Sequence, residues 1–137
     1  METLNFLGQG FGVALMPTNL MMAAIGALIG TIVGMLPGLG PINGVALLMP
    51  LAFALKLPAE TALILLTAVY IGCEFGGRIS SILLNVPGDA GAIMTAIDGH
   101  PMARSGRAGV ALSISAWALF IGFTIATAGI VLFAPLL

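Results

Sequence analysis

The sequence predicts an all-α protein made of polytopic transmembrane helices with broken or re-entrant helical arms, and three observations lead to this prediction. First, 60% of the 137 residues are hydrophobic, 7% are charged, and the mean hydropathy is +1.19. A soluble domain is about one quarter charged. Second, the apolar residues form unbroken runs, whereas a membrane β-barrel needs segments of about ten residues with alternating polarity. Third, Pro-Gly clusters interrupt these runs without adding charge.

The composition also excludes several classes of function. Four scattered basic residues and a net charge of −1 cannot form a phosphate-binding patch, so no nucleic-acid partner is expected. The single cysteine, Cys73, and the single histidine, His100, exclude an internal disulfide, a cysteine cluster and a multi-histidine metal site. The sequence contains no H-E-x-x-H, G-x-S-x-G or P-loop motif. We therefore expect neither an enzyme nor a bound cofactor or metal.

The first half of the chain lacks charge between Glu2 and Lys56, a stretch of 53 residues that is too long for one span. Met16–Asn19 contains a proline and separates a first apolar piece from the 17-residue apolar run Leu20–Leu36. That run is near the lower limit for a spanning helix, about 17 residues. It carries three glycines at a spacing of four, Gly26, Gly30 and Gly34, which predicts close packing of another helix on this face.

A first Pro-Gly break follows at Leu36–Pro41, where two prolines and two glycines cannot continue a helix. Its flanks are apolar, so it is either a tight loop at the membrane surface or an unwound stretch at membrane depth. The latter is tolerated only where protein or a water-filled cavity covers the freed backbone groups. Asn43–Leu55 is short for a span and is interrupted by Pro50, so we expect a half-helix or re-entrant arm.

The next helix is expected to run from Pro58 to about Gly72, since Pro58 and Glu60 suit a first helical turn. Glu74 and Arg78 follow at a spacing of four, which suits either a structural ion pair or a functional site inside the membrane. The pair Gly76-Gly77 is able to break the helix and cancel this spacing. Ile79–Val86 is expected to be another short apolar arm.

A second Pro-Gly break lies at Asn85–Gly91, and Asp89 within it stands where it could cap a helix over Ala90–Ile97 or contact a substrate. Asp98–Gly109 is the most polar stretch and is expected to be a loop, with His100 as a turn residue. Its two arginines, Arg104 and Arg107, favour a cytoplasmic location. Ala111–Phe133 has 23 uncharged residues, about 35 Å of helix, which is enough to span a membrane.

Two breaks flanked by short apolar arms are typical of transporters, which bind substrate where discontinuous helices meet. The amino ends of such half-helices suit carboxylates, and their carboxyl ends suit a cation such as sodium. Each polar residue near the two breaks could take part in such a site, or could instead cap a helix or form a hydrogen bond between helices. These residues are Asn43, Ser80, Ser81, Asn85, Asp89 and Thr95.

Four motifs in order give the chain a family resemblance: Gly34–Pro41, Tyr70–Gly77, Ile82–Gly88 and Ala96–Ala103. Together they resemble the large membrane (permease) subunit of the tripartite tricarboxylate transporter family, in its N-terminal portion. The resemblance implies a multi-pass subunit of the bacterial inner membrane that works with a small membrane subunit and a periplasmic solute-binding protein. It implies secondary import of citrate-like tricarboxylates or other carboxylates, driven by a sodium or proton gradient.

Matched position by position, the tips of the two breaks would face the substrate. The residues of these tips, together with the neighbouring Asn43 and Asp89, are the substrate-binding candidates: Pro37, Gly38, Gly40, Pro41, Asn43, Asn85, Pro87, Gly88 and Asp89. Glu74 and Arg78 depart from the pattern, because small or uncharged residues are expected there in many relatives.

The resemblance covers only the first portion of a subunit that is several times longer and has a second related half. We therefore expect residues 1–137 to form one transmembrane domain, the first repeat of a larger permease. Two alternatives remain. One is a non-transporting assembly or scaffold module that associates through the face of Gly26, Gly30 and Gly34. The other is a truncated inactive fragment, since Pro135-Leu136-Leu137 ends the chain without a polar flank.

Overall fold

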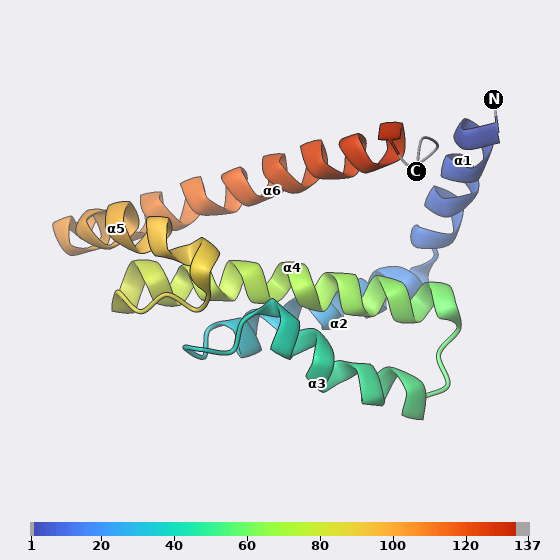
Figure 1. Cartoon of the computed structure of the whole chain (residues 1–137), viewed down its shortest axis with the longest axis horizontal. Helices are drawn as coiled ribbons and strands as arrows, with labels where there is room; N and C mark the ends of the chain where they lie inside the picture. The colour runs from blue at the N-terminus through green and yellow to red at the C-terminus, as the bar shows by residue number, and fades with distance from the viewer. Residues whose placement is uncertain (1, 134–137) are drawn as a thin grey trace.

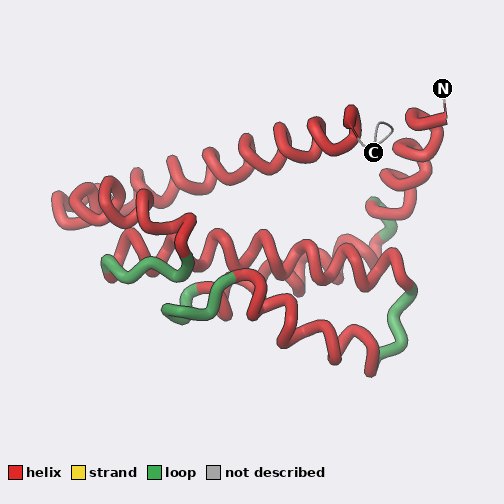
Figure 2. Tube along the Cα trace, in the orientation of Figure 1, coloured by secondary structure: helices red, strands yellow, loops and turns green. Residues whose placement is uncertain are grey.

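The computed structural model describes residues 2–133, and helices make up most of this part of the chain (Figures 1 and 2). In order they are α1 (Glu2–Ala14), α2 (Pro17–Gly34), α3 (Pro41–Ala54), α4 (Ala59–Leu84), η1 (Ala90–Ala92), α5 (Ile93–Met102), η2 (Ala103–Arg107) and α6 (Ala108–Phe133). No strand occurs within residues 2–133, so the all-α prediction is confirmed. The terminal Pro135-Leu136-Leu137 lies outside the described residues.

Within the described residues, three segments are long and apolar enough to cross a membrane: α2, α4, and the stretch Ala90–Phe133 that contains α6. Large apolar side chains point outward from them; Leu28, Ile125 and Trp117, for example, are 66%, 68% and 65% exposed. An apolar exterior of this kind suits a lipid solvent. The chain is therefore an α-helical membrane protein, as the sequence predicted. With 14 residues α3 is the short arm expected there, but Pro50 does not interrupt it, because the helix is continuous from Pro41 to Ala54.

The second helix begins earlier than expected, at Pro17 rather than Leu20, and ends at Gly34 rather than Leu36. Proline has no N–H group and a fixed φ, which suits the first helical position. Pro17 therefore starts α2 instead of only separating it from α1. With 18 residues α2 is about 27 Å long.

The fourth helix corrects two expectations, because α4 is continuous from Ala59 to Leu84. The helix does not end near Gly72, and Ile79–Val86 is not a separate arm. Glycine is a poor helix former in isolation. Here Gly72 and Gly76 lie against the backbone of α2, so tertiary packing holds the helix together where local propensity would weaken it.

Glycines from both helices make the contact between α2 and α4. A Cβ atom built on Gly26 would lie 2.6 Å from the carbonyl oxygen of Leu65, and one on Gly30 would lie 2.9 Å from the Cα atom of Val69. Gly34 contacts the backbone of Cys73 in the same way. Partner numbers rise together on both helices, so α2 and α4 run parallel. The predicted close packing on this face is confirmed.

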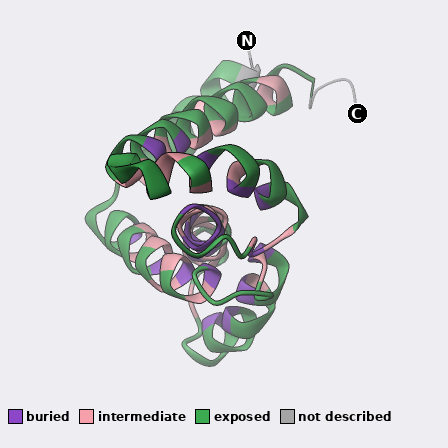
Figure 3. Cartoon of the chain, turned by 90° about the vertical axis from the view of Figure 1, so that its left-hand side faces the viewer, coloured by how far each residue is buried: buried purple, intermediate pink, exposed green. Residues whose placement is uncertain are grey.

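Helix α4 lies at the centre of the molecule. Figure 3 looks along this helix and shows it surrounded by other helices, with much of its surface buried. On one side Leu48 of α3 packs with Val69 and Cys73 in a buried cluster. Since α2 and α4 run the same way, α3 must return along them between the two.

The polar stretch Asp98–Gly109 is not a loop, which corrects another expectation. Asp98 to Met102 complete α5, and the chain continues as η2. The turn into α6 occurs at Gly106, whose φ of 83° favours glycine. His100 is a helical residue rather than a turn residue. Its Nδ1 lies 3.0 Å from the carbonyl oxygen of Ile82, near the end of α4, and so helps to dock α5 on α4.

Candidate functional site

The two Pro-Gly breaks meet against one side of α4. A Cβ atom on Gly40, in the first break, would lie 3.5 Å from the Cβ of Asp89 in the second. One on Gly88 would lie 2.8 Å from the Cα of Gly77 and 3.3 Å from the carbonyl oxygen of Gly34. Segments far apart in the sequence, the end of α2 and the loop after α4, are therefore in contact.

This meeting point lies beside α4 and not beyond its end. The 26 residues of α4 extend over about 39 Å, and Gly77 is seven residues, or about 10 Å, before Leu84. The second break folds back along α4 over this distance to reach Gly77. Because α4 is a candidate membrane span, the breaks meet alongside this span, about 10 Å from its carboxyl end. At Gly88 the unwound backbone is therefore covered by α4, as unwound backbone at membrane depth requires.

Two helical segments start at this point and run in opposite directions. The first begins after Gly40, whose carbonyl accepts from the N–H groups of Asn43 and Gly44 at 3.1 and 3.2 Å; it runs toward the start of α4 as α3. The second begins after Asp89 and continues through η1 into α5, which reaches Ile82 near the end of α4. The positive ends of their dipoles thus lie close together, while the carboxyl end of α2 adds a negative end.

The candidate residues differ in their exposure to solvent. Pro41 and Gly88 are buried, and Gly40, Pro87 and Asp89 are half-buried. Four others are exposed: Pro37, Gly38, Asn43 and Asn85. The structure therefore brings Gly40 close to Asp89, with Gly88 beside Gly77, while the four exposed candidates have no described partner side chain.

Two exposed candidates have a backbone role that the sequence did not assign. Gly38 has a φ of 86°, which only glycine adopts without strain. Asn85 is the C-cap of α4, with a φ of 57°, and its N–H donates to the carbonyl of Ser81 at 3.2 Å. Asparagine tolerates this left-handed conformation better than most residues do.

The polar residues near the breaks mostly satisfy local backbone groups. Asp89 caps η1, accepting a hydrogen bond from the N–H of Gly91 on its Oδ2 at 3.3 Å, so the predicted cap is confirmed. The hydroxyls of Ser80 and Ser81 donate to the carbonyl of Gly77 at 2.9 and 2.7 Å. Both bonds lie within α4, so these serines neither cap a helix nor bond between helices, which were the alternative roles expected for them.

Three further residues lie at the site: Gly34 and Gly77, which sequence reasoning did not place there, and Glu74, for which a functional site was one of two alternatives. The first two provide the backbone surface on which Gly88 lies. Glu74 is half-buried on α4, and the charges that act on it are those of Asp89 and Arg78. Gly72 and Gly76 are spaced by four, like the glycines of α2. This spacing could have indicated that α4 packs closely against another segment here.

No group of three or more His, Cys, Asp or Glu side chains that could hold a metal ion is found among the described residues. Any cation at the meeting point would therefore depend on backbone carbonyl groups together with one or two carboxylates.

These features define a polytopic membrane protein with broken helices that converge on one site. Residues 20–137 match the model of the tripartite tricarboxylate transporter TctA family. This match covers most of the sequence, so the chain belongs to that family of membrane transporters.

A curated relative from Agrobacterium vitis is 42% identical over 135 residues, which cover 98% of this chain; it is an uncharacterized 52.8 kDa protein in the TAR-I ttuC' 3' region. The chain spans 26% of the length of that relative. No solved structure matches the chain.

The glycine face proposed for a scaffold module is already occupied. Gly26, Gly30 and Gly34 contact α4 of the same chain. A second protein could bind there only by displacing α4, so the structure does not favour association through this face.

Proposed function

We propose that this chain contributes the first half of the substrate site in a permease subunit that imports citrate-like tricarboxylates or other carboxylates. The observation that carries the proposal is the close approach of Gly40 to Asp89, which brings the amino ends of α3 and η1 together beside α4. The family membership supports a transport function, and the geometry supports a particular place for it.

A carboxylate suits this point for electrostatic reasons. The first N–H groups of a helix have no partner within the helix, and the helix dipole adds a partial positive charge there. Pro41 lacks an N–H, and those of Asn43 and Gly44 already donate to the carbonyl of Gly40, so on α3 the donor left for a substrate is the N–H of Ile42. Away from bulk water these interactions are stronger than at a surface.

Cation coupling follows from the negative groups at the same place. A substrate carboxylate beside Asp89 would be repelled unless a cation were bound with it. The carboxyl end of α2 and the carboxylate of Asp89 offer oxygen atoms to sodium, and Glu74 lies near enough to interact electrostatically with Asp89. We therefore propose symport with sodium or a proton, in which the cation binds between the substrate and these acids.

The other components follow from the family. We propose that the chain acts in the inner membrane of a bacterium, with a small membrane subunit and a periplasmic solute-binding protein that delivers the substrate. Because the chain spans about a quarter of its relative, a second repeat would complete the site from the opposite side.

Uptake of labelled citrate by proteoliposomes that contain the whole transporter tests the proposal. Gly88→Ala places a methyl group 2.8 Å from the Cα of Gly77, so it should separate the second break from α4 and reduce uptake more than tenfold. Gly122→Ala is the matched control, because a Cβ there meets nothing within 4 Å.

A second variant removes the charge of Asp89 and keeps its hydrogen bond from the N–H of Gly91. Asp89→Asn keeps an oxygen that can accept from Gly91 and removes the negative charge. Uptake should then need a steeper sodium or proton gradient, with the protein still folded. Wild-type rates and unchanged gradient dependence for both Gly88→Ala and Asp89→Asn would contradict the proposed site.

A further inference from the structure

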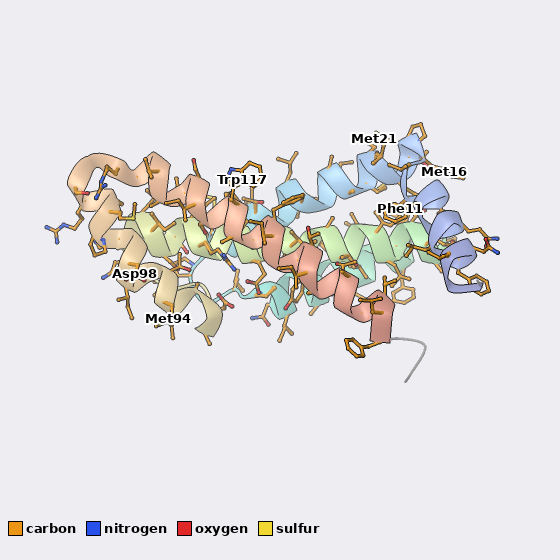
Figure 4. The ribbon with its side chains drawn as sticks, turned by 90° about the horizontal axis from the view of Figure 1, so that it is seen from above. Phe11, Met16, Met21, Met94, Asp98 and Trp117 are labelled. Carbon is orange, nitrogen blue, oxygen red and sulfur yellow. The ribbon has the colours of Figure 1, made fainter. Side chains whose placement is uncertain are left out.

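A separate cavity of about 280 Å³ lies between α4, α5 and α6, and none of its lining residues belongs to either break. Four polar or charged residues line it: Arg78 of α4, Thr95 and Asp98 of α5, and Ser115 of α6. Figure 4 shows α5, with Met94 and Asp98 labelled, beside the first part of α6. Met94 and Ile114 belong to the remaining walls, which are mainly apolar.

Ser115 is the least satisfied of these residues. It is 7% exposed, and its hydroxyl is buried without a hydrogen-bond partner. Other hydroxyls on the same helix bond to the helix backbone: Ser113 donates to the carbonyl of Gly109 and Thr124 to that of Phe120, both at 2.8 Å. A buried hydroxyl without a partner is unfavourable, so Ser115 indicates that something else binds in this cavity.

The two charged residues restrict what that ligand can be. Arg78 would repel a simple cation, and Asp98 would repel a simple anion. A ligand that carries both signs would satisfy both side chains. The apolar walls add a preference for a molecule that also has a hydrocarbon part.

The cavity also lies at the right depth for a lipid headgroup. Arg78 is six residues, or about 9 Å, before the end of α4, and Ser115 is seven residues, or about 10 Å, after the start of α6. Arg104 and Arg107 lie at this end of the helices. Pockets between helices at such a position bind lipid headgroups, and the one basic and one acidic residue of this pocket suit a headgroup with both charges.

We propose that this cavity binds the headgroup of a zwitterionic phospholipid with a primary ammonium group, that is, phosphatidylethanolamine. The phosphate accepts hydrogen bonds from Arg78, Thr95 and Ser115, whose hydroxyl turns toward it by a change of χ1 rotamer. The ammonium group donates to Asp98. The cavity is slightly smaller than typical sites for whole ligands, about 300–1,000 Å³, so the acyl chains lie outside it along exposed apolar residues such as Met94 and Ile114.

Native mass spectrometry of the purified protein tests this assignment. The probes are phosphatidylethanolamine, phosphatidylcholine and phosphatidylglycerol with identical acyl chains, and inorganic phosphate. Phosphatidylethanolamine should bind about tenfold more tightly than the other two lipids, since only its headgroup supplies both a phosphate and a hydrogen-bonding ammonium group. Inorganic phosphate should not displace it.

Variants test the residues. Ser115→Ala should weaken binding of phosphatidylethanolamine about tenfold, whereas Ser113→Ala, the matched control on the same helix, should not change it. Asp98→Asn should abolish the preference for phosphatidylethanolamine over phosphatidylcholine.

Three results would overturn the proposal: equal affinity for the three lipids, wild-type affinity in Ser115→Ala, or displacement of the lipid by inorganic phosphate. Cross-linking of a Ser115→Cys variant to another protein segment would do so as well. These readouts do not involve transport, so they are independent of the proposed carboxylate site.

Discussion

Gly30 lies at the middle of the contact between α2 and α4, and replacing it with alanine tests whether this contact holds the two helices in place. The added methyl carbon would lie closest to the carbonyl oxygen of Val69 and 2.9 Å from both the Cα and the carbonyl carbon of that residue. An ordinary contact begins at about 3.4 Å, so the helices must move apart by at least about 0.5 Å. The obstructing atoms belong to the backbone and cannot rotate away.

The expected free energy follows from two opposing effects. Overpacking of a close contact costs about 1–3 kcal/mol. Alanine is a better helix former than glycine by up to about 1 kcal/mol, which offsets part of this cost. We expect Gly30→Ala to destabilise the folded protein by about 1–2 kcal/mol, a change of about five- to thirtyfold in the population of the open form.

Labelling of Cys73 measures this opening directly. Cys73 is the single cysteine of the sequence, is 1% exposed, and lies where α4 contacts Gly34. In detergent, a thiol-reactive fluorophore should label Gly30→Ala about five to thirty times faster than the wild type, at a lower Tm. Gly122→Ala, with open space around its Cβ, should label at the wild-type rate. Equal rates for Gly30→Ala and Gly122→Ala would refute the packing argument.

Three other substitutions test local features, each by thermal unfolding in detergent. Asn19→Ala should lower the free energy of unfolding by about 1–2 kcal/mol. Asn19 is 3% exposed, and its side chain donates to a carbonyl of α1 at 2.7 Å and accepts from the hydroxyl of Thr61 at 2.8 Å. A wild-type Tm would contradict this. Gly38→Ala should cost about 1 kcal/mol from its positive φ alone, and Gly38→Asn less. His100→Ala should lose the bond to Ile82, lower the Tm, and speed hydrogen exchange at the end of α4 if that bond docks α5.

Local chemistry explains why much of the helix pattern could be predicted. Proline and glycine clusters act on their own neighbours, so both breaks, the short α3 and the cap at Asp89 followed from the sequence. The spacing of four among the glycines of α2 likewise predicted a close helix contact, since residues four apart share one helix face.

Residues of α4 show where the same reasoning failed. Gly76 and Gly77 favour a break when considered alone, but α2 and the second break pack against them, and α4 continues. His100 resembled a turn residue in a polar stretch, but its bond to Ile82 belongs to a docked helix. In both cases a partner distant in the sequence supplies the deciding interaction, and no local rule contains that partner.

By itself the sequence determined that this is a helical membrane protein with two interrupted segments, because apolar runs and proline act through solvation and backbone sterics that need no tertiary contact. Only the tertiary structure decided that the interruptions meet. The parallel packing of α2 on α4 brings Gly34 to Gly77, and the loop after α4 folds back to the same point. That convergence depends on glycine-to-backbone contacts between residues about forty positions apart, which a linear pattern cannot specify.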